Sequence, residues 1–146
     1  MKKLTYVLAA LLILFCLIQI IPVNRENPEF DVEYDFDAPV EVKEIVVNSC
    51  YDCHSNQTDW PWYNYVAPTS WFTLGHVNDA REKMNFSEWL LQPDEKRQKI
   101  KEEMIEEIEE GNMPLPPYLI MHPVAELTDE QLLVLKTWAF AKADSI

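Results

Sequence analysis

The sequence contains only two glycines, Gly75 and Gly111, among 146 residues. Nucleotide-binding loops such as G-x-G-x-x-G and the P-loop need at least two glycines close together, so this scarcity excludes them. Basic residues are also scarce, because 12 lysines and arginines stand against 25 aspartates and glutamates and give a formal net charge of −13. Proteins that bind nucleic-acid phosphates normally carry a basic patch, so we expect no nucleic-acid partner.

Ten prolines combined with so few glycines favour a helical protein with proline-rich loops over a β-sandwich. The length predicts one domain. Hydrophobic residues make up 48% of the chain, which is enough for a core, although part of this share lies in one N-terminal run.

The first 23 residues have the pattern of a membrane segment. Lys2 and Lys3 precede an uncharged run, Leu4 to Val23, whose 20 residues would span about 30 Å as a helix, the thickness of a hydrocarbon core. No small-residue cleavage site follows, and Cys16 lacks the small preceding residue typical of a lipoprotein. We therefore expect residues 1–23 to be an uncleaved anchor in a bacterial inner membrane. The two lysines favour a cytoplasmic N-terminus and place the rest of the chain on the outer, periplasmic face.

The remainder divides into an acidic linker, residues 24–39, and a folded domain, residues 40–146. The linker has no helical period and contains Pro28 and Pro39, so we expect it to be extended. In the domain, the hydrophobic spacing predicts an all-α fold. The expected helices cover Val40–Cys53, Thr69–Lys83, Asp94–Glu110 and a last segment that begins at Thr128.

Local signals set the ends of these helices. Gly111 stands where a glycine commonly ends a helix, and Thr128 with Gln131 matches a capping box. The stretches Ser55–Pro68 and Asn112–Pro123 contain several prolines and are expected to be irregular. One wide apolar stripe is expected on the second helix, and the acidic residues near Glu102–Glu110 are expected to be a solvated helix face. The stripe comprises Trp71, Phe72, Leu74, Val77 and Ala80.

The segment Cys50-Tyr51-Asp52-Cys53-His54 matches C-x-x-C-H, the attachment signature of a c-type haem. Two thiols one helical turn apart can add to the two vinyl groups of a porphyrin, and His54 can reach the iron from the proximal face. A Cys50–Cys53 disulfide is an alternative in an oxidising compartment. A thioredoxin-like site needs a βαβ context that is not visible, and structural zinc needs four ligands, for which only His76 and His122 remain.

The sixth iron ligand has several candidates. We expect Met113, because an irregular, proline-flanked segment can present a thioether to the haem face. The main alternative is His76, followed by His122 and by an open or water-bound iron. Met84, Met104 and Met121 are further candidates, and Met104 is expected in the core. Aromatic residues are dense near the motif and are expected to help line the haem pocket: Tyr51, Trp60, Trp62, Tyr63, Tyr65 and Trp71.

Residues about 40–142 resemble the small bacterial haem-binding domain family, a relative of class I cytochrome c. The resemblance rests on Cys50–His54, the aromatic segment Trp60–Tyr63 and Gly111–Pro114, together with Ala67-Pro68, Trp71, His76-Val77, Arg81, Asn85–Ser87, Trp89, Tyr118, His122-Pro123 and the segment Leu127–Ala139. It implies a cytochrome c-like helical domain around one covalent haem c, often tethered by an N-terminal helix. The Met-Pro segment also looks like that of cytochrome c, which supports Met113.

Two classes of function follow from a haem site. With two protein ligands the iron has no open position, so the expected function is one-electron transfer rather than catalysis. The acidic surface would then attract a basic redox partner. The alternative is a haem-based sensor or a peroxidase-like enzyme, which needs a vacant or displaceable sixth position. No distal acid–base pair accompanies the motif, and His76 would be the only obvious distal group.

Overall fold

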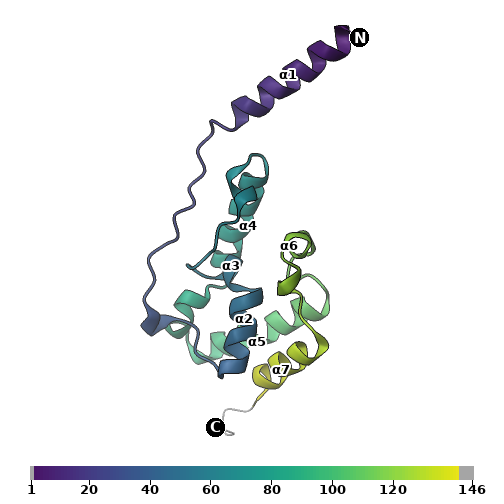
Figure 1. The fold of residues 1–146 in the computed structure, drawn as a ribbon. Helices are drawn as coiled ribbons and strands as arrows, with labels where there is room; N and C mark the ends of the chain where they lie inside the picture. Colours follow the sequence, from purple (N-terminus) through teal and green to yellow (C-terminus); the bar gives the residue numbers. More distant parts are fainter. Residues whose placement is uncertain (1, 142–146) are drawn as a thin grey trace.

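The computed structural model describes residues 2–141, and within them the chain forms helices and connecting segments without any β-strand. Figure 1 shows a helical domain with α1 projecting from it. The expectation of an all-α fold is confirmed for this part of the chain. The α-helices are α1 (Lys2–Ile18), α2 (Val40–Ser49), α3 (Tyr51–His54), α4 (Thr69–Lys83), α5 (Asp94–Glu109), α6 (Pro116–Met121) and α7 (Asp129–Ala139). Short 3₁₀ helices are η1 (Val32–Tyr34), η2 (Trp62–Tyr65), η3 (Phe86–Leu91) and η4 (Pro123–Ala125).

The first predicted helix of the domain is divided at Cys50. Its backbone leaves the helical region, with φ −127° and ψ −30°, so α2 ends at Ser49 and α3 begins at Tyr51. The carbonyl oxygen of Cys50 then accepts a hydrogen bond from the His54 amide at 2.9 Å, which closes the single turn of α3. The C-x-x-C-H motif, predicted to attach a haem, therefore occupies a separate helical turn.

The signals for the other helix ends are largely confirmed. α4 has the predicted bounds, and α5 ends where Gly111 adopts a φ of +73°. Left-handed backbone of this kind is a common way to end a helix. Thr128 and Gln131 form the expected capping box at the start of α7.

The expectation that Asn112–Pro123 is irregular is wrong for its second half, because Pro116–Met121 forms α6. Two prolines occupy the first two positions of this helix. The first residues of a helix have no intrahelical acceptor for their N–H groups, so a proline there costs no hydrogen bond and its fixed φ suits the helix. Proline content was therefore a poor guide to this segment.

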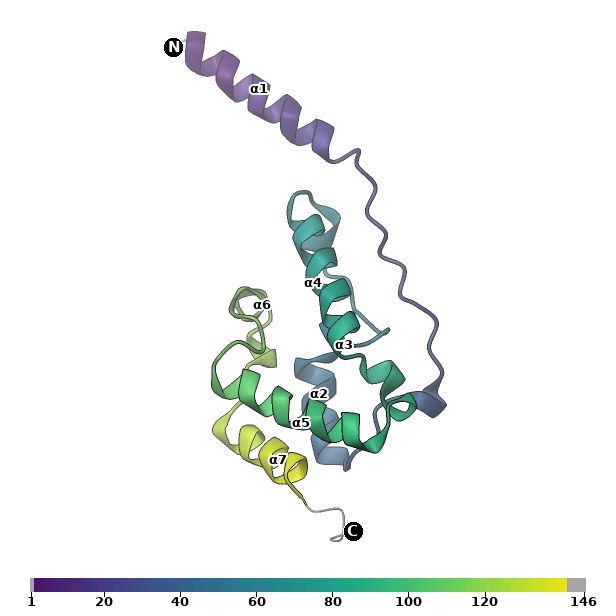
Figure 2. The same cartoon turned by 180° about the vertical axis from the view of Figure 1, so that it is seen from behind.

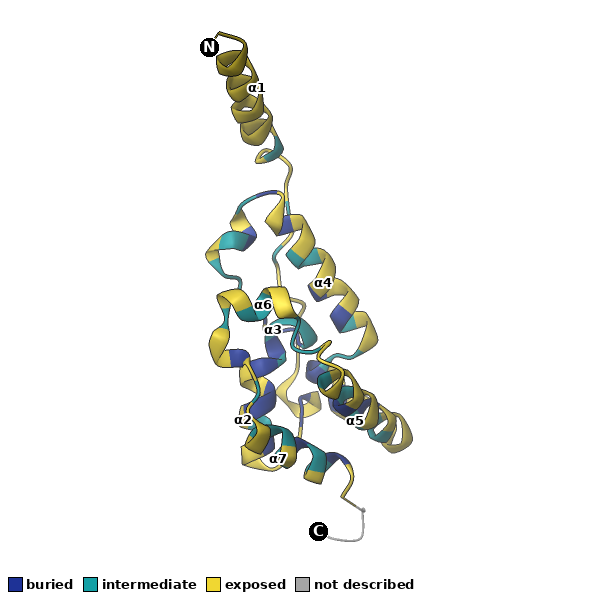
Figure 3. Ribbon diagram, turned by 90° about the vertical axis from the view of Figure 1, so that its right-hand side faces the viewer, coloured by how far each residue is buried: buried dark blue, intermediate teal, exposed yellow. Residues whose placement is uncertain are grey.

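The core lies between α2, α3, α5, α7 and η3, and it includes a residue that the sequence places in the linker. Phe36 is 1% exposed, and its ring meets those of Phe86, Trp89 and Trp138 edge-on, at centroid distances of 4.8, 5.2 and 5.5 Å. The end of the segment 24–39 is thus packed into the domain. Figure 3 shows the buried residues gathered on the facing sides of α2, α5 and α7.

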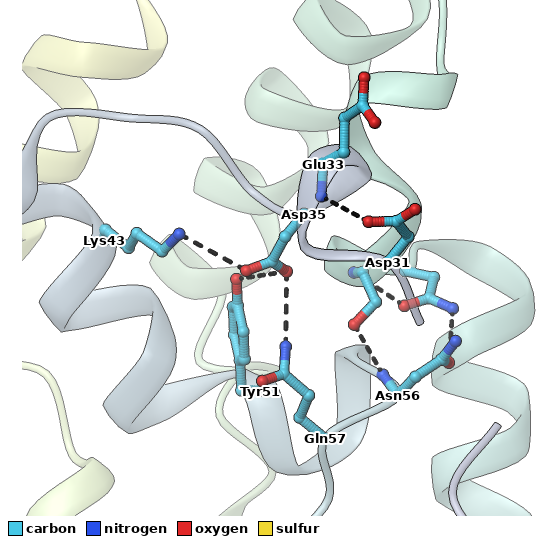
Figure 4. A network of polar contacts seen from close by, with 9 residues as sticks. Asp31, Glu33, Asp35, Lys43, Tyr51, Asn56 and Gln57 are labelled. Atoms are coloured by element: carbon cyan, nitrogen blue, oxygen red, sulfur yellow. Dashed lines mark hydrogen bonds and ion pairs between the residues drawn. The ribbon is translucent and has the colours of Figure 1, made fainter. Parts of the chain in front are cut away.

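Hydrogen bonds hold the rest of this segment against the haem-attachment turn. The buried carboxylate of Asp35 accepts a hydrogen bond from the Tyr51 hydroxyl at 3.1 Å and forms an ion pair with Lys43 at 3.4 Å (Figure 4). Burial is the main cause that raises the pKa of Tyr51, with Asp35 adding to it, so the phenol stays protonated and donates. The Asn56 side chain also donates to the Glu29 carbonyl.

The stripe expected on α4 is only partly buried. Val77 and Ala80 are buried, whereas Trp71 and Phe72 are exposed to 38% and 67%. The N-terminal half of α4 extends beyond the core, as Figure 2 shows, so Trp71 and Phe72 stay largely outside it.

Helix α1 lies apart from the domain, and its side chains are almost all exposed. It ends at Ile18, five residues before the predicted end at Val23. Looser turns follow as far as Ile21, and Pro22 has no N–H with which to continue a helix. Within residues 2–141, no helix is both long and apolar enough to cross a membrane.

Candidate haem site

A cavity of about 560 Å³ opens between the haem-attachment turn, α4, α5 and the segment that follows α5. This volume lies within the range of about 300–1,000 Å³ that is typical of small-molecule sites. Cys50, Cys53 and His54 line one side, and Met113 and His76 also line the cavity. The residues that the sequence predicts to bind one haem are far apart along the chain, and they line the same cavity.

The thiols of the motif stand free within it. Cys50 and Cys53 form no disulfide, so the disulfide alternative finds no support in the structure. Burial raises the pKa of Cys50 to about 12, and the neighbouring Cys53 adds to this shift. Burial also raises the pKa of Cys53 to about 11, and the charge of Asp52 adds to it. Both groups are therefore neutral thiols at physiological pH.

The imidazole of His54 is oriented by the end of α4. Its Nδ1 atom lies 3.2 Å from the carbonyl oxygen of Met84. Burial lowers the pKa of His54, so the ring is neutral, with one nitrogen carrying a proton and the other a lone pair. When Nδ1–H donates to the carbonyl, Nε2 keeps the lone pair. Metal-binding histidines commonly have this arrangement, because the backbone acceptor fixes both tautomer and ring orientation.

Met113 reaches the cavity because of the way α5 ends. Gly111 turns the chain back, and the amides of Asn112 and Met113 both donate to the Glu107 carbonyl, at 2.9 and 3.1 Å. These bonds fix the backbone of Met113 over the last turn of α5. Its side chain is half-buried and lines the cavity.

His76 is the second candidate at the cavity. It lies on α4 and is exposed, and its Nδ1 atom is 2.7 Å from the Phe72 carbonyl oxygen. This contact again leaves Nε2 as the nitrogen with a free lone pair when Nδ1 carries the proton. The structure therefore brings both Met113 and His76 to the cavity.

The remaining candidates are placed less favourably. His122 does not line the cavity: its Nε2 atom lies 2.8 Å from the Tyr63 hydroxyl, and its ring stacks on Tyr118 at 4.2 Å. Met121 is also outside the lining. Met84 and Met104 line the cavity, but the backbone of Met84 lies beside the His54 ring, and Met104 packs against the core from α5.

Comparison with known families decides the class of ligand. The family described as a haem-binding domain matches residues 13–141. The chain belongs to the haem-binding domain family. No curated protein and no solved structure is similar enough to the chain to count as a match, so the assignment rests on the family itself.

The donor set of this haem-binding domain fits the ligand of its family. A cavity of suitable volume presents two neutral thiols, an imidazole with an available Nε2 and a thioether. Within residues 2–141, no three or more His, Cys, Asp or Glu side chains are grouped so that they could hold a metal ion.

The aromatic residues near the motif do not line the cavity, contrary to expectation. Tyr51 is in the core, whereas Trp62 and Tyr65 are exposed. The aromatic residue at the cavity is Tyr118, on α6, whose hydroxyl donates to the Asp52 carboxylate at 2.7 Å. Nothing in the local sequence of Tyr118 indicates this role, because the contact joins residues 66 positions apart.

The electrostatics of the cavity are strongly acidic. Lys83 is the only Lys or Arg among its described lining residues, whereas several carboxylates from α4, α5 and the end of α5 line it, with Asp52 from α3. The solvated acidic face expected on α5 therefore also borders the haem cavity. The carboxylates are Asp52, Asp79, Glu103, Glu106, Glu107 and Glu110.

Proposed function

We propose that this chain is a membrane-attached, single-haem c-type cytochrome that transfers one electron at a time. The observation that carries the proposal is one cavity that is lined by all four expected haem-binding residues: Cys50, Cys53, His54 and Met113. When bound, haem supplies an Fe(III)/Fe(II) couple whose potential depends on its axial ligands.

The two cysteines serve as covalent attachment points in this proposal. Each thiol would hold the haem through one thioether bond, formed when its S–H adds across a vinyl group so that sulfur is bound to one vinyl carbon and hydrogen to the other. The addition needs no oxidant. Support comes from the free, protonated state of both thiols and from their place on one helical turn.

His54 and Met113 would hold the haem iron. The Met84 carbonyl orients the His54 ring, and the end of α5 holds the backbone of Met113. A thioether ligand together with a histidine would raise the potential, which suits a carrier of fairly high potential. Since both of these protein groups would then bind the iron, the site would transfer electrons without binding a substrate there.

The acidic border of the cavity supports a basic redox partner. Carboxylates around a cofactor create a negative potential that speeds the approach of a positively charged protein and orients it. The Glu-rich face of α5 is the part of this border that we expect the partner to contact.

Attachment to the membrane is proposed from residues 1–23, with the haem domain on the outer face of a bacterial inner membrane. The support is the uncharged run from Leu4 to Val23 behind Lys2 and Lys3, together with the exposed apolar side chains of α1. Fractionation of cells and N-terminal sequencing of the mature chain test it. A chain that begins near residues 22–30, or that is found in the soluble fraction, would contradict it.

His76 is the observation that favours a second function, that of a haem-based sensor or peroxidase-like enzyme. An exposed histidine in the same cavity is a candidate for a weak, displaceable ligand or a distal acid–base group. The optical spectrum of the reduced full-length chain, with and without carbon monoxide, separates the two functions. A carrier gives an unchanged spectrum, and a sensor or enzyme gives a carbon monoxide complex.

A further inference from the structure

Besides the N-terminal run, two long segments of this acidic chain contain no Asp, Glu, Lys or Arg: residues 60–78 and 111–125. Charged residues make up 25% of the whole sequence, so two such gaps stand out from the rest of the domain. The first segment covers η2 and most of α4, and the second covers α6 and η4.

The fold brings these two segments together. The Tyr63 hydroxyl of the first lies 2.8 Å from His122 Nε2 of the second, and the two rings meet edge-on at 6.0 Å. Figure 1 shows the start of α4 and α6 on the side of the domain that faces α1, away from α7. We call this surface, formed by residues 60–78 and 111–125, the uncharged end.

Large apolar side chains are exposed on the uncharged end. Trp62 is 69% exposed, Phe72 67% and Ile120 79%, and Tyr65, Trp71 and Met121 are exposed as well. Exposed apolar patches are typical of interaction sites. The charged side chains that contact this surface include Arg25, whose guanidinium lies over the Tyr65 ring, and Asp52, which accepts a hydrogen bond from the Tyr118 hydroxyl. Trp and Tyr in particular are enriched where a protein meets the headgroup region of a membrane.

Helix α1 emerges directly beside this surface. The Gln19 side chain, one residue after α1, donates to the Ala67 carbonyl at 3.1 Å and accepts from the Ala67 amide at 2.9 Å. Arg25 further along donates to the Asn64 carbonyl at 2.7 Å. Any bilayer that holds the apolar α1 therefore lies next to the uncharged end.

We propose that the uncharged end docks on the surface of a neutral phospholipid bilayer, with its exposed aromatic rings at the level of the headgroups. This inference rests on the proposed membrane attachment. All 25 Asp and Glu residues lie outside residues 60–78 and 111–125. The two segments that would face the lipid therefore contribute no carboxylate side chain to the contact. His76 and Met113 belong to the same two segments and also line the cavity, so docking holds the cavity beside the membrane.

The test uses the full-length, haem-loaded chain in phosphatidylcholine vesicles that contain a phosphatidylcholine with a photoactivatable carbene precursor near its headgroup. Mass spectrometry then maps the labelled residues. We expect label in α1 and, at least tenfold above the level in α7, in residues 62–72 and 118–121. Val40 and Leu133 are exposed apolar residues on α2 and α7 at 74% and 65%, and they serve as unlabelled controls within the same molecule.

Paired variants make the test specific. Replacing both exposed rings (Trp62→Ser with Phe72→Ser) is expected to reduce label in residues 118–121, whereas the matched double change Val40→Ser with Leu133→Ser is expected to leave it unchanged. Label confined to α1 overturns the docking and leaves the attachment intact. Label in neither region overturns both, and cross-linking between two chains at residues 62–72 assigns the surface to a second copy instead. The haem spectrum of the same samples reports independently on the proposed electron-transfer function.

Discussion

The Nδ1 atom of His54 lies 3.2 Å from the backbone carbonyl oxygen of Met84. This contact joins the attachment turn, α3, to the end of α4, 30 residues further along the chain. It orients the imidazole, and when Nδ1 carries the proton, the lone pair is on Nε2. The contact comes from the backbone of Met84, so the identity of that side chain is not what holds His54.

The first prediction compares the methionines at the cavity. Met113→Leu is expected to abolish the weak near-infrared sulfur-to-iron band of the oxidised protein, to lower its potential and to open the reduced iron to carbon monoxide. Met84→Leu and Met104→Leu keep the volume of the side chain and are expected to leave band and potential in place. Absorption spectroscopy and a redox titration measure these effects.

Substitution of His76 completes this comparison. If Met113→Leu retains the band and stays closed to carbon monoxide while His76→Ala opens the site, the ligands are two histidines. The assignment of Met113 is then wrong, although electron transfer remains the function.

The second prediction concerns the core under the attachment turn. Phe36→Ala removes a ring that is 1% exposed and contacts three other aromatic rings. We expect the free energy of unfolding to fall by about 3–5 kcal/mol, as for other buried Phe→Ala changes. Phe30→Ala, at a site 41% exposed in the same segment, is expected to change it by about 0.5 kcal/mol or less. Equal effects in chemical denaturation of the two variants would show that Phe36 is not part of the core.

The third prediction uses the two glycines as a matched pair. A Cβ atom added at either position meets nothing within 4 Å, so sterics against neighbours do not decide the outcome. Gly111 has a φ of +73°, which costs an L-residue about 1–2 kcal/mol, so Gly111→Ala is expected to destabilise the fold. Gly75 lies inside α4, where alanine is favoured by about 1 kcal/mol, so Gly75→Ala is expected to stabilise it. Thermal unfolding measures both, and shifts of the same sign would contradict the helix end at Gly111.

Local signals in the sequence predicted much of the fold. Thr128 and Gln131 correctly predicted the start of α7, and Gly111 predicted the end of α5. These signals are readable in the sequence because a helix cap is formed by residues within a few positions of one another. The attachment motif is likewise local, since Cys50 to His54 share one helical turn.

Features that depend on distant contacts were missed. Phe36 lies in an acidic segment without a period, and only the assembled rings of Phe86, Trp89 and Trp138 make it a core residue. The apolar spacing of Trp71 and Phe72 indicates a buried stripe, yet the N-terminal half of α4 extends past the core. The role of the Met84 carbonyl was equally unpredictable. Every residue type carries a backbone carbonyl, and only the folded structure places this one beside His54.

The central claim, that Cys50 and Cys53 hold the haem of this domain covalently, is tested most directly by acid–acetone extraction. The full-length chain is produced in cells with a haem-attachment system, and haem that remains with the protein is measured together with its mass. We predict that the wild type and Cys16→Ala retain one haem, and that Cys50→Ala with Cys53→Ala releases it. Free extraction of haem from the wild type, or the same mass and spectrum in the double variant, would contradict the claim.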